Sequence, residues 1–236
     1  MSETGMLGAL MPKEPGGARI YGVVVGQVTD NNDPSNLGRV KLKFPWISED
    51  HKTDWVRVMT PMAGKERGFF FLPEVGDEVL VTFHFGDVSQ PYVLGALWSK
   101  ADAPPPAANE GQSGGGERNV NRRVIRSTAG HTITLDDTKG KEKITIVDKG
   151  GKNRIEIDSV SDKVTIESNQ GIDIKAAGDI TIDSKKKVSI KCGSLSVTAD
   201  EGFSLVAKQG ASLTASILDL NGKKGVRLNE DGLVVI

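Results

Sequence analysis

The sequence is poor in cysteine, in aromatic residues and in long apolar runs. Its single cysteine, Cys192, excludes a framework of disulfides within the chain. No stretch approaches the roughly 20 apolar residues that a membrane-spanning helix needs. Only 5% of the 236 residues are aromatic, and 30 basic residues against 31 acidic ones leave a formal net charge of −1. This balance argues against a general affinity for polyanions, so no nucleic-acid partner is expected.

The N-terminal segment, residues 1–17, is rich in glycine, proline and small side chains and has no usable periodicity. This composition predicts a flexible arm. The segment also lacks the basic start and the apolar stretch of about 7–15 residues that mark a secretory signal. We therefore expect the protein to be assembled in the cytoplasm, and any later exit requires a route without a cleaved leader.

Short alternating segments between residues 18 and 100 predict a small β-barrel. Clusters of turn-forming residues at 31–36 and 73–77 separate these segments. Five or six short strands without a convincing helix fit an OB-fold barrel. The expected strands are residues 21–29, 39–44, 54–59, 68–72, 78–85 and 92–95.

Residues 101–117 contain Pro104-Pro105-Pro106 and Gly114-Gly115-Gly116. A segment of this composition cannot build a core, so we interpret it as a linker and a domain boundary. The second domain is then expected over residues 118–236.

Apolar-polar-apolar triplets recur along this second domain at an almost constant interval. Between residues 155 and 205 there are seven, and their first members are spaced 9, 8, 8, 8, 7 and 8 residues apart. In a strand, the two outer side chains of such a triplet point to one face and the middle one to the other. Each triplet is therefore predicted to be a short strand that is dry on one side. The outer residues are Ile155, Ile157, Val164, Ile166, Ile172, Ile174, Ile180, Ile182, Val188, Ile190, Leu195, Val197, Phe203 and Leu205.

Two architectures fit an eight-residue repeat of strand and turn: an antiparallel meander and a β-helix. The gaps between triplets mostly lack two-residue hairpin signals such as Asn-Gly, which favours the β-helix. Two inward side chains per strand could not fill the wide interior of a single-chain coil. Three chains wound together would enclose a narrow axis instead. The sequence therefore predicts an all-β protein whose C-terminal half is a triple-stranded, intertwined, homotrimeric β-helix, with the outer triplet residues along the trimer axis.

The residue types that carry catalysis or bind metals do not form a convincing site. The three histidines lie far apart and lack the spacing of metal ligands. The Gly-x-Ser-x-Gly sequence at residues 111–115 lies in the predicted linker, whereas such a nucleophile works between a strand and a helix. The segment that begins at Asp30 fails as a calcium loop because Lys41 stands where a glutamate ligand is required. We predict no enzyme activity and no catalytic, cofactor-binding or metal-binding residue.

Several blocks of the first domain carry a resemblance to a known family. They include residues 26–30 (GQVTD), 33–42 (DPSNLGRVKL), 44–46 (FPW), 71–81 (FLPEVGDEVLV) and 91–98 (PYVLGALW). In this order they closely resemble the OB domain of baseplate spikes, namely phage baseplate assembly protein V and the VgrG proteins of type VI secretion. The triplets of residues 155–205 resemble the triple-stranded β-helix that follows this domain in the same family.

The resemblance implies a homotrimeric central spike of a contractile injection machine. Such a spike sits below a hub and an inner tube in the baseplate, and it is driven through a target membrane when the sheath contracts. It belongs to a phage virion or an injection particle, and its blunt C-terminal end is often capped by a PAAR-type tip protein.

This sequence also departs from the family pattern. No hub domain precedes the barrel, so the resemblance implies a separate hub protein. The lysozyme domain of some phage spikes and the iron-binding His-x-His pair of some spike tips have no counterpart here. The apolar end then needs a cover and is the expected docking site for the tip protein. Its residues are Leu233, Val234, Val235 and Ile236.

Two other functions compete with the spike. A β-helical adhesin or tailspike that binds or cleaves glycans needs paired carboxylates or aromatic platforms, but the acidic residues of the triplet region are scattered. An OB-fold nucleic-acid binder could use Trp46, Trp55 and Trp98 as stacking platforms. These residues lack a surrounding basic cluster, so core packing or contact between subunits is favoured.

Overall fold

The structure is a computed structural model that describes residues 19–109 and 120–223. The chain divides into two compact units at Ile174 and Lys175. The predicted linker at residues 101–117 does not coincide with this division, and it contains one short helix, α2 (Pro106–Asn109). The predicted arm at residues 1–17, the Gly-x-Ser-x-Gly sequence and the predicted tip-docking residues Leu233 to Ile236 lie outside the described residues.

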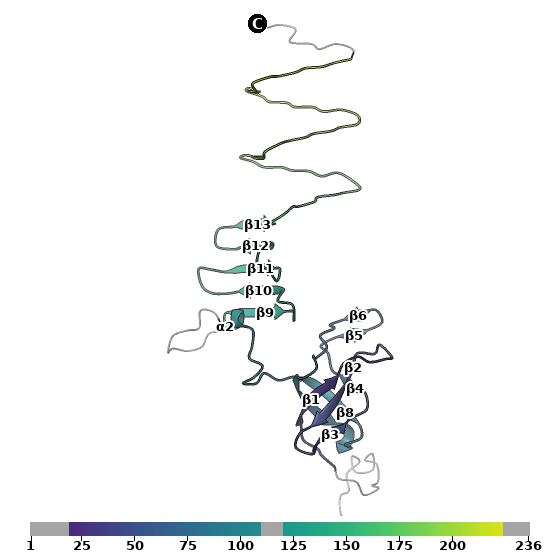
Figure 1. Ribbon diagram of the computed structural model, residues 1–236. Helices are drawn as coiled ribbons and strands as arrows, with labels where there is room; N and C mark the ends of the chain where they lie inside the picture. The colour runs from purple at the N-terminus through teal and green to yellow at the C-terminus, as the bar shows by residue number, and fades with distance from the viewer. Residues whose placement is uncertain (1–18, 110–119, 224–236) are drawn as a thin grey trace, which may run out of the picture. The chain divides into compact units, whose positions relative to one another are not determined.

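The N-terminal part is a closed β-barrel, as the sequence predicts (Figure 1). Its strands follow the sheet order β1-β7-β8-β4-β2, and a further pairing between β1 and β2 closes the ring, while β3 pairs with β2. A 3-10 turn, η1 (His84–Gly86), leads from β7 towards β8. The strands are β1 (Val24–Asp30), β2 (Arg39–Phe44), β3 (Ser48–Lys52), β4 (Val56–Val58), β7 (Glu78–Phe83) and β8 (Pro91–Ala96).

Every second side chain along the strands points into the barrel and fills its interior. In β2 and β7 every second side chain is buried, which is the period of a strand with one dry face. The Phe44 and Phe83 rings meet at 5.9 Å between centroids, an inclined arrangement that aromatic pairs favour. The buried core consists of Val28, Val40, Leu42, Phe44, Val56, Val79, Val81, Phe83 and Val93.

A buried ion pair fixes the turn between β1 and β2. The Asp33 carboxylate accepts two hydrogen bonds of 2.8 Å from the Arg39 guanidinium. It also accepts hydrogen bonds from the backbone N–H groups of Ser35 and Leu37. The Arg39 hydrogen bonds hold the pKa of Asp33 well below its usual range, and the backbone donors add to this effect. Asp33 is therefore an anchor of the turn.

One predicted barrel strand is wrong, one strand was not predicted, and one predicted strand ends earlier than expected. The expected strand at residues 68–72 is replaced by a small hairpin, β5 (Ala63–Gly64) and β6 (Arg67–Gly68), after which the chain leaves the sheet. The unpredicted strand β3 is polar, and it lies at the end of the sheet order, where it needs no apolar face. The predicted strand 78–85 ends at Phe83 because Phe85 has a left-handed backbone conformation with φ of 48°.

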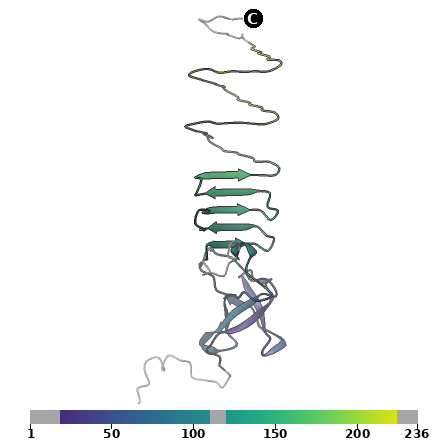
Figure 2. The same cartoon turned by 90° about the vertical axis from the view of Figure 1, so that its left-hand side faces the viewer.

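Residues 122–167 form a five-stranded antiparallel meander, in the order β13-β12-β11-β10-β9 (Figures 1 and 2). Its hairpins turn at residues with positive φ such as Gly130, Gly140 and Gly151. The strands are β9 (Arg122–Arg126), β10 (Thr132–Asp136), β11 (Lys143–Val147), β12 (Arg154–Asp158) and β13 (Lys163–Glu167).

The meander corrects the predicted β-helix for the first two triplets. Ile155 pairs with Ile166 and Ile157 pairs with Val164, as neighbours in antiparallel strands of one chain. The turn between these strands is longer than a two-residue hairpin: the Asp158 carboxylate accepts hydrogen bonds from the N–H groups that follow it, and Asp162 has φ of 49°. A turn of this kind has no two-residue sequence signal, which is why the sequence does not predict this hairpin.

Residues 168–223 contain no strand and no backbone-to-backbone hydrogen bond in the structure. Figures 1 and 2 show a wide zigzag whose successive passes do not lie beside one another. Backbone N–H and C=O groups normally find partners in folded proteins. This part of the chain therefore lacks within itself the neighbours that its alternating sequence requires. In the described ranges, no helix has the length and apolarity to cross a membrane.

Candidate assembly surface

The meander has one apolar face that is exposed in the single chain. The side chains on this face, which we call the apolar face, are between 39% and 63% exposed. Alternation places them on one side of the sheet, as in the triplets. The apolar face consists of Ile125, Ile133, Leu135, Ile144, Ile146, Ile155, Ile157, Val164 and Ile166.

The strand register aligns these side chains in two rows. The first row crosses all five strands and contains only isoleucine: Ile125, Ile133, Ile146, Ile155 and Ile166. The second row contains Leu135, Ile144, Ile157 and Val164, with Arg123 at its β9 end. A shallow groove of about 490 Å³ follows the isoleucine row. Contiguous apolar patches of this kind mark interaction sites, because water leaves them favourably.

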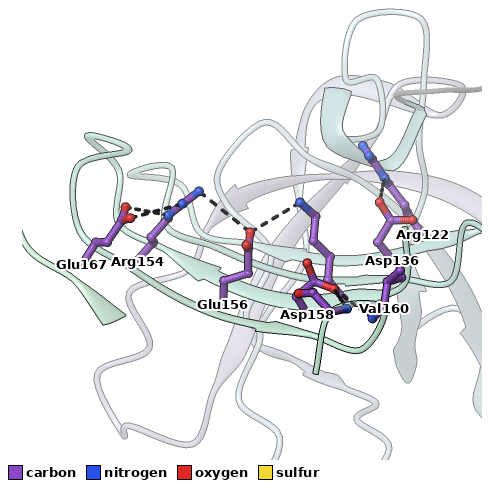
Figure 3. A network of polar contacts seen from close by, with 9 residues as sticks. Arg122, Asp136, Arg154, Glu156, Asp158, Val160 and Glu167 are labelled. Carbon is purple, nitrogen blue, oxygen red and sulfur yellow. Dashed lines mark hydrogen bonds and ion pairs between the residues drawn. The ribbon is translucent and has the colours of Figure 1, made fainter. Parts of the chain in front are cut away.

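The opposite face of the meander is mostly polar, and several of its charged side chains are paired (Figure 3). Arg154 lies 2.8 Å from Glu167 and 3.8 Å from Glu156, and Lys143 lies 3.4 Å from Glu156. These partly exposed ion pairs each contribute little free energy, but they give these charged side chains partners within the chain itself. The apolar face is consequently the one that needs a cover.

Asp136 anchors the β9 end of the polar face. Its carboxylate is 4% exposed and lies 2.8 Å from the Arg122 guanidinium. Burial by itself raises the pKa of Asp136, but hydrogen bonds from Thr138 and Arg122 outweigh it and hold that pKa below its usual value. The pair therefore remains charged at neutral pH and links the first two strands of the sheet.

The triplets beyond the meander share a repeating environment. Ile172, Ile180 and Val188, the first members of three triplets, are 53–56% exposed, whereas the third members Ile174, Ile182 and Ile190 are 70–74% exposed. The exposure of these side chains thus repeats every eight residues. The last two triplets lose this difference after the seven-residue spacing, and their outer residues are Leu195, Val197, Phe203 and Leu205.

The structure brings some of the predicted axis residues together and leaves others apart. Ile155, Ile157, Val164 and Ile166 share the apolar face, whereas the predicted axis residues from Ile172 to Leu205 are exposed and belong to no strand of the described residues. Whether either group lines a three-fold axis stays a prediction. Five members of the apolar face are not among the predicted axis residues, because their segments are spaced less regularly than the seven triplets. They are Ile125, Ile133, Leu135, Ile144 and Ile146, and four of them have the same apolar-polar-apolar spacing in β10 and β11.

Outside these surfaces, the described residues contain no group of three or more His, Cys, Asp or Glu side chains that could hold a metal ion. His131 accepts a hydrogen bond from the backbone N–H of Lys149 at its Nδ1 atom, and His84 lies against Phe85 and Tyr92. Trp46 and Trp98 are exposed, so the alternative of core packing is wrong for these two residues. Contact between subunits remains the prediction for them.

Comparison with known proteins identifies the barrel. Residues 24–98 match the family model of the type VI secretion system/phage-baseplate injector OB domain. The barrel is therefore similar to an injector OB domain. The match covers all the barrel strands, so the resemblance seen in the sequence blocks is confirmed.

The wider chain resembles VgrG spike proteins. It is 26% identical over 226 residues to the actin cross-linking toxin VgrG1 of Vibrio cholerae, a match that covers 94% of this chain and 18% of the relative. It is 31% identical over 128 residues to the type VI secretion system spike protein VgrG3 of the same species, covering 52% of this chain and 12% of the relative. It is also 31% identical over 150 residues to the spike protein VgrG1a of Pseudomonas aeruginosa, covering 58% and 22%. The chain therefore spans less than a quarter of the length of each of these relatives.

Proposed function

We propose that this protein is the homotrimeric central spike of a contractile injection machine, with a mechanical and non-enzymatic role. The injector OB domain and the similarity to VgrG spike proteins support the baseplate spike. The trimer and the puncturing role go further, and they are supported by the unpartnered surfaces of the chain.

One observation carries the trimer: the exposed apolar face of β9–β13 is followed along the chain by apolar triplets that pair with no strand among the described residues. Burying an apolar side chain contributes about 1.5–3 kcal/mol before conformational entropy is subtracted. A chain that left all these side chains in water would forgo this contribution. Assembly with identical chains buries the same stripe on every copy.

The width of the stripe favours three copies. Each strand of the meander offers at most two apolar side chains to the apolar face, for example Ile155 and Ile157 in β12. Three such sheets can enclose a narrow axis that these side chains fill, and the closed ring leaves no apolar face free. The polar faces then point outwards, where their paired charges meet water.

The same trimeric arrangement accounts for residues 168–223. Each chain supplies one short strand per layer, and the strands of the other two copies provide the backbone partners that the single chain lacks. The product is a rod whose apolar core runs along the three-fold axis from Ile172 to Leu205. A rod of this kind resists bending and concentrates force on a small tip.

The remaining parts of the proposal are the partners. A separate hub protein and the inner tube and baseplate proteins would bind the spike, and a PAAR-type tip protein would cover Leu233, Val234, Val235 and Ile236. The machine would be assembled in the cytoplasm, and the spike would meet the target membrane only on firing.

Sedimentation velocity on the full chain tests the central claim. We expect a single species with three times the mass of the 25.2 kDa chain and with the high frictional ratio of an elongated particle. A monomer at micromolar concentration would contradict the proposal.

A further inference from the structure

The OB domain carries an exposed aromatic segment that its own barrel does not use. We call residues 59–72 the aromatic arm: it contains the β5–β6 hairpin and the consecutive residues Phe69, Phe70 and Phe71. All three phenylalanines are exposed, and Phe70 is 78% exposed. Three adjacent exposed aromatic side chains are unusual on a surface that faces only water.

The aromatic arm is an ordered structure. The backbone N–H of Phe69 donates to the Met62 carbonyl at 3.0 Å, and the Thr60 hydroxyl donates to the Phe69 carbonyl at 2.6 Å. The Phe69 and Phe71 rings stack at 6.5 Å between centroids. The Phe70 ring lies over Gly38, where a Cβ atom would come within 3.1 Å of it. The arm therefore presents Phe70 in a defined position.

A cavity of about 320 Å³, which we call the barrel pocket, opens on the same domain. Phe44, Trp55 and Phe83 contribute aromatic walls, and Val88 and Pro91 stand beside them. The Lys41 ammonium lies 4.9 Å from the centre of the Trp55 ring, an interaction that stabilises the position of this ring. Aromatic walls favour an aromatic guest, because inclined ring pairs add to the free energy of burial.

The arm does not fill the pocket of its own chain in the structure. Phe70 lies over Gly38 and is not among the residues that line the pocket. Two different and complementary patches on one chain are the requirement for a head-to-tail contact between copies.

We propose that Phe70 of each copy inserts into the barrel pocket of the next copy, so that three OB domains close into a ring. This inference rests on the proposed trimer. Head-to-tail contacts form a closed ring only when the rotation between copies closes after a fixed number of them, here three; otherwise they form an open filament. The occupant of the pocket is thus a second copy of this chain. The arm of one copy covers the pocket of the next, and these contacts hold the three OB domains together in a ring.

A disulfide trap tests this contact in the full-length chain. In a Cys192→Ala background, Phe70→Cys is combined with Val88→Cys at the rim of the pocket. Mild oxidation should give a covalent trimer on non-reducing gels, because each bond joins two copies. The matched control combines Phe70→Cys with Val75→Cys, another exposed valine, which precedes β7 at the end away from Phe83. The control should give no covalent trimer.

Hydrogen exchange supplies a second readout that needs no disulfide geometry. In the native trimer we expect slow exchange in residues 51–56 and 84–91, and Phe70→Ala should accelerate it there while leaving β9–β13 unchanged. Val75→Ala should change neither region. A protein that sediments as a trimer but shows neither the trap nor the Phe70-dependent protection would overturn the ring and leave the proposed spike standing. A protein that sediments as a monomer would overturn both.

Discussion

Replacing Ile133 with aspartate gives the sharpest test of the apolar face. Ile133 lies in β10, within the isoleucine row, between Ile125 and Ile146. It is 39% exposed in the single chain, so an aspartate there can reach water without disturbing the sheet. In the proposed trimer, by contrast, three copies of the side chain would be buried near the axis.

The cost of this change follows from two contributions. Full burial of an isoleucine side chain contributes about 1.5–3 kcal/mol. Assembly can bury only the 39% of Ile133 that is still exposed in the single chain. Losing this contribution in three copies costs roughly 2–4 kcal/mol per trimer. The charge contributes more. Neutralising an aspartic acid at pH 7 costs about 4 kcal/mol, because the ordinary pKa of its carboxyl is about 3.9, and this sets an upper limit of about 12 kcal/mol for three carboxyls.

The pH dependence of assembly distinguishes this mechanism from a general loss of packing. Burial raises the pKa of the introduced carboxyl in the trimer, so the penalty is present at pH 7 and disappears as the pH falls towards the unshifted pKa. Ile133→Asp should therefore dissociate at pH 7 and reassemble partly near pH 4.5.

Thr134→Asp is the matched control, since it adds the same charge one residue along β10 on the polar face. Sedimentation equilibrium at both pH values measures the association constants of the two variants. A trimer of Ile133→Asp that is as stable at pH 7 as that of Thr134→Asp would refute the assignment of the apolar face.

Three further predictions use other parts of the chain. Ile172→Asp should lower the melting temperature of the trimer steeply, while Asp173→Asn at the middle position of the same triplet should not; equal melting curves would show that Ile172 does not face the axis. The pKa of the Asp136 carboxyl is lower in the folded protein than in the unfolded chain, where it is about 4. The ionised carboxylate therefore stabilises the fold above about pH 4, and this stabilisation is lost as the pH falls through the lower pKa of the folded state. Asp136→Asn should therefore melt at a lower temperature at pH 7 but lose less stability than the native protein between pH 4 and pH 2, and parallel melting profiles over this range would contradict the role of the carboxylate. Gly38→Ala should reduce the free energy of unfolding by about 1–2 kcal/mol, because Gly38 has a left-handed backbone with φ of 67°. Gly95→Ala, where nothing lies within 4 Å of the new Cβ, should have a smaller effect. Urea-induced unfolding of the two variants measures the difference.

The alternation of apolar and polar residues predicts much of this fold because it is a local property. A period of two fixes which side chains share a face, whatever the strand later pairs with. The barrel strands β2, β7 and β8 were predicted almost at their observed bounds, and the outer residues of β12 and β13 do share one face. The assignment of the barrel to injector OB domains came from sequence blocks that lie in its turns and strands.

The parts of the fold that depend on turns or on neighbouring strands cannot be predicted from local alternation. Polar β3 has no apolar period, so only its pairing with β2 reveals it as a strand. The run Phe69–Phe71 has the composition of a strand, yet its hydrogen bonds go to Met62 and Thr60 instead of a sheet. The turn after Asp158 is made by side-chain acceptors and by a non-glycine residue with positive φ, for which no two-residue signal exists.

The sequence by itself determined that the second half of the chain would carry one continuous apolar stripe, since the spacing of its triplets allows nothing else in extended strands. Only the tertiary structure decided that residues 122–167 pair as an antiparallel meander, that the register of this meander aligns Ile125 to Ile146 with the first two triplets on one face, and that residues 168–223 make no backbone-to-backbone hydrogen bond among the described residues. The physical reason is that side-chain direction is set by each residue's own backbone, whereas strand pairing is set by turn geometry and by the surfaces that remain to be covered.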